Sequence, residues 1–206
     1  MFSSRRKTIM EKKKETTTSL SFSPCHDIEI LNTEKIASSM SENEFKITAQ
    51  SEFLSLLGKA YWLETQFENI SQWQAYMTVK DESYRNALFT LSHDSEKHKT
   101  ILTELIANFE GITTETLEEH AGLKQKEFDL RGKWDEEIIT ELLKNEYLAL
   151  DVYTKLYMHT DRDFLQKLWI GENFELFFKQ LEFLMKEEKK HINILTPLAG
   201  KLERIL

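Results

Sequence analysis

The chain has 206 residues and a formal net charge of −8, with six glycines, two prolines and one cysteine. Glycine and proline are too scarce for the many turns of an all-β or α/β fold, so the composition predicts an all-α protein. The acidic balance excludes nucleic acid as the main partner, because neutralising phosphates requires clustered Lys and Arg.

The single cysteine and the apolar distribution bear on where the protein works. Cys25 alone can form neither an intrachain disulfide nor a Cys-x-x-Cys metal centre, so we expect a reducing, cytoplasmic setting. No stretch reaches the roughly 20 apolar residues of a membrane span, and the N-terminus lacks the apolar core of a secretory signal, so no membrane partner is expected. The Arg- and Ser-containing start is compatible with an organelle transit peptide, but Glu11 and Glu15 disfavour it.

The first part of the chain differs in composition from the rest. Residues 1–45 are rich in Ser, Thr, Lys and Glu and have one small apolar cluster, at residues 28–31. Such a segment cannot bury a core, so it is predicted to be a mostly disordered tail. Residues 46–206 are predicted to form one helical domain.

Apolar residues recur at spacings of three and four from Ser51 onward, which predicts a first helix over about 48–79. Asp81 is a suitable N-cap for a second helix that continues to Gly111. Because the break between the two helices is short, they are expected to be antiparallel neighbours.

The second half of the chain repeats this plan after a long connection. Residues 111–133 contain a possible capping box at Thr116 and Glu119 and are long enough to run the length of a bundle. A third helix is predicted from about 135, then a looser stretch over 159–171, then a fourth helix over about 173–200 that Pro197 bends or ends. The expected fold is therefore a ferritin-like antiparallel four-helix bundle with a long crossover between the second and third helices.

Polar residues interrupt each of the four apolar stripes. In chain order they are Glu64, Ser95, His98, Glu146, Glu188 and His191. Glu188 and His191 lie three residues apart and so share the inward face of the fourth helix. Several ionised carboxylates in one core repel one another and are costly to bury unless a cation neutralises them.

Carboxylates and imidazoles on neighbouring helices can hold two iron or manganese ions. The recurring pattern is one Glu from each of two helices and a Glu-x-x-His pair from each of the other two. The sequence supplies five such ligands, of which Glu146 and Glu188 are expected to bridge: Glu64, His98, Glu146, Glu188 and His191. Ser95 takes the sixth position, so one metal position is expected to be weak. Asp94 or Glu96 could replace it only through a local distortion, because each points about 100° away on a regular helix.

Three segments resemble the rubrerythrin branch of the ferritin-like superfamily: HDSEKHKTIL around His98, NEYLALDVY with Glu146 and Tyr153, and KEEKKHINIL with Glu188 and His191. The similarity covers about residues 48–198. It implies a non-haem diiron, or degenerate diiron, oxidoreductase of peroxidase or ferroxidase type that acts on oxygen, peroxide or ferrous iron. Besides Ser95, the chain departs from the family in lacking a rubredoxin-like cysteine domain, so a separate electron donor is implied. Asp94, Ser95 and Tyr153 are candidates to replace a ligand or to contact one.

A second hypothesis is a metal-free helical bundle with a structural or partner-binding role, supported mainly by Ser95. Under it, Glu64 and Glu146 would lie at stripe edges and reach water, and His98 would be a neutral core histidine bonded to Asp94 or to a tyrosine hydroxyl. A homodimer formed through the outer helix faces is compatible with either hypothesis.

Overall fold

The computed structural model describes residues 46–71, 74–120, 130 and 132–199. The chain divides into two units, Met1–Asn43 and Glu44–Leu206, and all described residues belong to the second. The predicted tail, with Cys25, therefore lies outside the described residues. The described part contains seven helices and no strand, so the predicted all-α class is confirmed.

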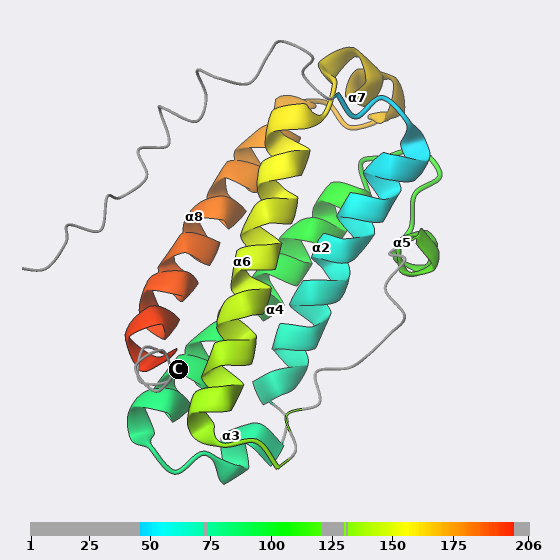
Figure 1. The fold of residues 1–206 in the computed structure, drawn as a ribbon. Helices are drawn as coiled ribbons and strands as arrows, with labels where there is room; N and C mark the ends of the chain where they lie inside the picture. Colours follow the sequence, from blue (N-terminus) through cyan, green and yellow to red (C-terminus); the bar gives the residue numbers. More distant parts are fainter. Residues whose placement is uncertain (1–45, 72–73, 121–129, 131, 200–206) are drawn as a thin grey trace, which may run out of the picture. The chain divides into compact units, whose positions relative to one another are not determined.

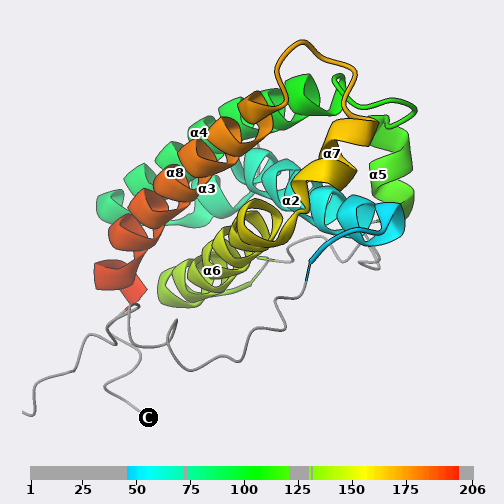
Figure 2. The ribbon, with the colours of Figure 1, turned by 90° about the horizontal axis from the view of Figure 1, so that it is seen from above.

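Four long helices lie side by side in a bundle-like arrangement (Figure 1). They are α2 (Gln50–Ser71), α4 (Glu82–Ile106), α6 (Asp135–His159) and α8 (Glu175–Ala199). Helix α2 packs against α4 and α6, and α8 packs against the same two helices (Figure 2). Neighbouring long helices run in opposite directions, so α4 and α6 face each other across the core (Figures 1 and 2).

Local chemistry explains where α4 begins and why its predicted start is confirmed. The Asp81 side chain accepts a hydrogen bond of 2.7 Å from the backbone N–H of Ser83, as an N-cap does. The predicted first helix, in contrast, corresponds to two helices in the structure. Helix α2 ends at Ser71 and α3 (Gln74–Thr78) follows it, with the junction at residues 72–73 outside the described part.

Two further short helices differ from the prediction, α5 in the residue that caps it and α7 in being a helix at all. Helix α5 (Thr114–His120) is capped by Thr113, whose Oγ1 accepts from the Thr116 N–H at 3.3 Å, so the box predicted at Thr116 and Glu119 is wrong. Helix α7 (Arg162–Leu168) occupies the stretch that was expected to be loose. It forms because the Asp161 side chain accepts from the Phe164 N–H at 3.0 Å.

Helix α8 continues past Pro197 to Ala199, so the proline does not end the helix at its own position. Proline removes one backbone donor, and here that donor belongs to the last turn of the helix, where the loss affects a single intrahelical bond.

The core lies between the long helices and includes an aromatic cluster near α7. Phe53 packs edge-on against Phe109 and Phe164, with ring centroids 5.3 and 5.9 Å apart. Each buried ring of this kind contributes roughly 1.5–3 kcal/mol relative to leaving it in water. No helix in the described part of the chain has both the length and the apolar character needed to cross a membrane.

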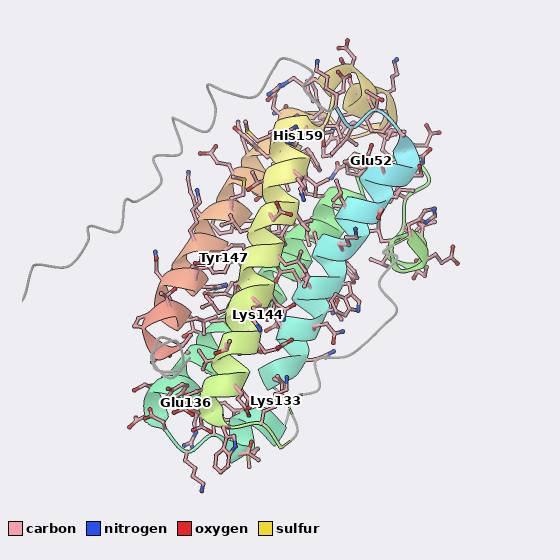
Figure 3. The ribbon with its side chains drawn as sticks, in the orientation of Figure 1. Glu52, Lys133, Glu136, Lys144, Tyr147 and His159 are labelled. Carbon is pink, nitrogen blue, oxygen red and sulfur yellow. The ribbon has the colours of Figure 1, made fainter. Side chains whose placement is uncertain are left out.

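Neighbouring residues of α6 show how this helix is turned. Lys144 and Tyr147 lie on the outside of α6 (Figure 3). Glu146, next to Tyr147 in the chain, is instead completely buried. A carboxylate is therefore turned into the core by the same helix geometry that exposes its neighbour.

Candidate metal centre

The structure brings the five predicted ligands to one place in the core. Each has 1% or less of its surface exposed, and together they come from all four long helices: Glu64 of α2, His98 of α4, Glu146 of α6, and Glu188 and His191 of α8. The stripe-edge interpretation of Glu64 and Glu146, in which their carboxylates reach water, is therefore wrong.

The two histidines are the centres of two small groups of side chains. His98 Nδ1 lies 3.4 Å from Glu64 Oε1 and 3.2 Å from Glu188 Oε1. His191 Nδ1 lies 3.3 Å from Glu146 Oε2 and 3.9 Å from Glu188 Oε2. The two imidazole rings stack, with centroids 5.6 Å apart and an interplanar angle of 28°.

Each group has the composition of a three-ligand cation site. Glu64, His98 and Glu188 can place one ligand atom each within 4.8 Å of one another, and so can Glu146, Glu188 and His191. Glu188 belongs to both groups, as expected of a bridging carboxylate. Glu146 belongs to one group only, so its predicted bridging role is not matched by this geometry.

Several ligand atoms have no hydrogen-bond partner in the described structure. Glu64 Oε2 and Glu146 Oε1 are buried with no partner, whereas His98 Nδ1 and Glu188 Oε1 make no well-directed hydrogen bond but lie 3.2 Å from each other. Buried polar atoms are almost always satisfied, and leaving one unpaired costs about 1–3 kcal/mol, more for a charged group. A cation bound in the cluster would satisfy the two carboxylate oxygens that have no partner and would replace the contact between His98 and Glu188. The residues present therefore fit a metal ion.

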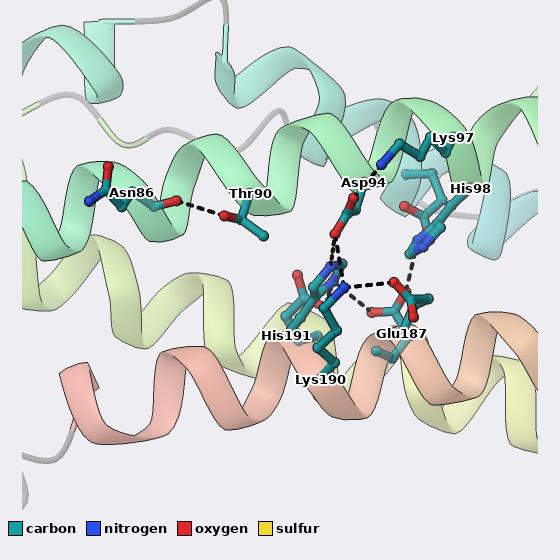
Figure 4. A network of polar contacts seen from close by, with 11 residues as sticks. Asn86, Thr90, Asp94, Lys97, His98, Glu187, Lys190 and His191 are labelled. Carbon is teal, nitrogen blue, oxygen red and sulfur yellow. Dashed lines mark hydrogen bonds and ion pairs between the residues drawn. The ribbon is translucent and has the colours of Figure 1, made fainter.

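Contacts from outside the cluster hold two of the ligands in place. The Tyr153 hydroxyl, fully buried, donates a hydrogen bond of 2.6 Å to Glu64 Oε1. On the other side, Asp94 Oδ2 lies 3.4 Å from His191 Nε2 (Figure 4). A carboxylate at Nε2 favours the tautomer with its proton there, which leaves the Nδ1 lone pair of His191 directed at the cluster.

Asp94 was a candidate to replace a ligand, which required a distortion of α4, or to contact one, and the structure matches the second role. Helix α4 is regular from Glu82 to Ile106, yet Asp94 reaches His191 because α8 packs against the face of α4 that carries Asp94. Asp94 is not part of either three-ligand group, so it contacts a ligand without replacing one. Asp94 and Tyr153 are thereby engaged with His191 and Glu64, and neither pairs with His98 Nδ1 as the metal-free interpretation expected.

Ser95 lies where the sequence analysis placed it, one turn before His98, with 1% of its surface exposed. A hydroxyl there supplies no negative charge. Glu96, the other proposed substitute, is exposed and cannot serve. The histidines His93 and His120 are likewise exposed and lie outside the centre.

The protonation of the cluster follows from burial. Burial raises the pKa of Glu146 to about 7, and burial together with the adjacent Glu146 raises the pKa of Glu188 to about 8. Burial and the charge of Glu188 also raise the pKa of Glu64. Burial alone would lower the pKa of His98, but Glu188 and Glu64 raise it to about 10. In the absence of a metal cation, protons held by the glutamates and by His98 therefore offset the negative charge of the buried carboxylates.

The ion pairs outside the cluster were missed by the sequence analysis. Asp94 Oδ1 lies 2.8 Å from Lys97 Nζ, and Lys190 Nζ lies 3.6 Å from Asp94 Oδ2 and 3.1 Å from Glu187 Oε2. Burial alone would raise the pKa of Asp94, but Lys97 and His191 lower it to about 2, so this carboxylate is ionised. The three-residue spacings of Asp94 with Lys97 and of Glu187 with Lys190 were the signals that could have revealed two of these pairs.

Comparison of the chain with protein-family models, with curated proteins and with solved structures found no match.

Proposed function

We propose that this chain is a non-haem iron protein with a ferritin-like four-helix bundle. The four long helices would form two antiparallel hairpins, α2 with α4 and α6 with α8, joined by a crossover between α4 and α6. The observation that carries the proposal is the buried cluster of three carboxylates and two imidazoles, in which Glu64 Oε2 and Glu146 Oε1 have no hydrogen-bond partner.

The donor set favours iron or manganese. Three carboxylates and two imidazoles offer oxygen and nitrogen donors, which suit these metals. Among the described residues the cluster contains no thiolate, the donor that softer metals prefer. One ion would be held by Glu64, His98 and Glu188, and a second by Glu146, Glu188 and His191. Ser95 adds no charge, so we expect the two positions to differ in affinity.

When bound, iron would supply the redox chemistry for the oxidation of ferrous ions or for reaction with oxygen or peroxide. The chain itself would bind the metal and hold the metal ligands in a fixed orientation. Tyr153 and Asp94 fix the Glu64 carboxylate and the His191 ring, and the surrounding apolar residues exclude water. Glu146 and Glu188, which hold protons in the metal-free protein, would release them as the ligands bind the cation. Reduction would need a separate electron donor.

A metal-free structural or partner-binding bundle is the second candidate, and one observation favours it. His98, with its raised pKa, lies between Glu64 and Glu188 and can itself act as the buried cation. The neutral Ser95 reduces the negative charge that a metal would have to balance.

The test is oxidant consumption by ferrous-loaded protein. Protein loaded anaerobically with ferrous iron is mixed with oxygen or hydrogen peroxide, and the absorbance of ferric iron is followed. The unmodified chain should react, and Glu188→Ala should lose most of the reaction because it removes the carboxylate shared by both groups. Glu182→Ala, an exposed glutamate of the same helix, is the matched control and should behave as the unmodified chain. Equal rates in both variants would contradict the proposal.

A further inference from the structure

The candidate centre is closed to solvent on every side, so any small molecule that reacts there must pass a side chain that can move. Each of the five ligands has 1% or less of its surface exposed. Behind Glu64 lies Tyr153, which is itself fully buried. The line of contact between α4 and α8, called the seam below, is less completely buried. Partly exposed side chains lie there in direct contact with ligands of the centre.

Phe183 of α8 is the apolar part of this seam. It keeps 44% of its surface exposed, although large aromatic side chains are usually well buried. Its ring meets the ring of His98 edge to face, with centroids 6.4 Å apart and an interplanar angle of 89°. A half-exposed ring therefore lies in direct contact with the buried His98.

The part of the seam over His191 is closed by charges instead. Lys190 connects Asp94 of α4 to Glu187 of α8, and Lys97 pairs with the other Asp94 oxygen (Figure 4). Opening this part means separating ion pairs around a carboxylate that also contacts His191. Opening the apolar part means rotating one ring, and partly exposed side chains change rotamer within nanoseconds or faster.

We propose that Phe183 is the lid of an entry path between α4 and α8, and that it admits small uncharged oxidants, of the size of oxygen or hydrogen peroxide, to the His98 side of the centre. The identity of the admitted molecule rests on the proposed function, whereas the lid itself does not. An uncharged molecule loses little hydration on passing an aromatic ring, while an ion loses much more. Phe183 is thus a residue that determines access and makes no contribution to metal binding.

The lid is tested first in metal-free protein. Exchange of the imidazole C2 hydrogen of His98 for deuterium, read by mass spectrometry of its peptide, reports access of solvent to that ring. Phe183→Ala should accelerate the exchange several-fold, and Phe183→Leu, which keeps part of the cover, should give an intermediate rate. Phe89→Ala is the matched control, because Phe89 is a similarly exposed ring of α4 that stacks on His93 and not on a ligand.

The second measurement uses ferrous-loaded protein mixed with oxygen. Phe183→Ala should react several-fold faster and Phe183→Trp more slowly, with unchanged metal stoichiometry and Kd. Lys190→Met, which opens the charged part of the seam, should not accelerate the oxygen reaction.

Three results would overturn the lid: His98 exchange equal in Phe183→Ala and the unmodified chain, an equal acceleration in Phe89→Ala, or an oxygen reaction accelerated as much by Lys190→Met. Faster His98 exchange in a chain that binds no metal would support the lid and refute the proposed function, so the two failures are distinguishable.

Discussion

The Tyr153 hydroxyl donates a hydrogen bond to Glu64 Oε1 at 2.6 Å and thereby joins α6 to α2 inside the core. The bond occupies one carboxylate oxygen and leaves the other, Oε2, without a partner. The orientation of Glu64 is thus set from behind, by a residue that belongs to neither three-ligand group. Groups that orient a ligand in this way typically change metal affinity by about 10–100-fold when they are removed.

Replacing this tyrosine as Tyr153→Phe should weaken metal binding at the Glu64 position by about tenfold, because the phenyl ring keeps the packing but not the hydrogen bond. Isothermal titration with Mn²⁺ under anaerobic conditions measures the change. Tyr157→Phe removes a hydroxyl from the same helix outside the centre and is the control. Equal affinities for the two variants would show that the Tyr153 bond has no role in metal binding.

Asp94→Asn should weaken binding at the His191 position by a similar factor, about tenfold or more. The substitution removes the negative charge at 3.4 Å from His191 Nε2 and with it the preference for the tautomer that frees Nδ1. The control is Asp151→Asn, an exposed aspartate paired with Lys155. A Kd unchanged by Asp94→Asn would mean that His191 is oriented by other contacts.

Ser95→Glu should raise the metal stoichiometry toward two per chain, because it adds a charged oxygen donor one turn before His98. Anaerobic titration with ferrous iron measures the number of ions bound, and Ser95→Gln, which has nearly the same shape but no charge, is the control. If the unmodified chain already binds two ions with equal affinity, Ser95 does not weaken either position and our account of this residue is wrong.

The metal-free protein should lose stability as the pH rises from about 5 to about 9. Glu188 and Glu146 have pKa values near 8 and 7 in the folded protein, against 4.5 when unperturbed, so the folded state binds these protons more tightly than the unfolded chain does. The stabilising contribution of His98 is fully present below its unperturbed pKa of 6.5 and is lost as the pH rises through about 10. All three groups therefore act in the same direction.

Thermal unfolding in the presence of a chelator, at several pH values, tests this prediction. The variant Glu188→Gln should show a weaker pH dependence, because the group with the pKa near 8 has been removed. Saturating metal should remove or reverse the trend, since deprotonated ligands bind the cation more tightly as the pH rises. A melting temperature that is highest at alkaline pH in the metal-free protein would contradict the protonation state described for the cluster.

The sequence was sufficient to predict the helices and the buried polar positions, because both depend on periodicity along a single helix. Glu64, Glu146 and the pair Glu188 and His191 could be placed inward from their spacing relative to apolar neighbours. Helix α7 was missed because a seven-residue helix offers too few apolar positions for a period to be recognised, although Asp161 was a visible cap.

Features that depend on how two helices face each other could not be obtained in this way. The contact between Asp94 and His191 and the ring of Phe183 over His98 follow from which helices are neighbours in space. An ideal helix wheel gives the direction of Asp94 relative to its own axis, but it cannot say that α8 packs at that face.

The central claim, that the buried carboxylates and histidines hold a metal, is tested most directly by elemental analysis of the untagged protein produced in iron-replete medium. The account predicts at least about one tightly bound iron or manganese ion per chain. It also predicts the loss of most of that metal in His191→Ala with little change in helix content, while the exposed His120→Ala retains it. A chain that contains no stoichiometric metal, or a His191→Ala variant that keeps as much metal as the unmodified protein, would contradict it.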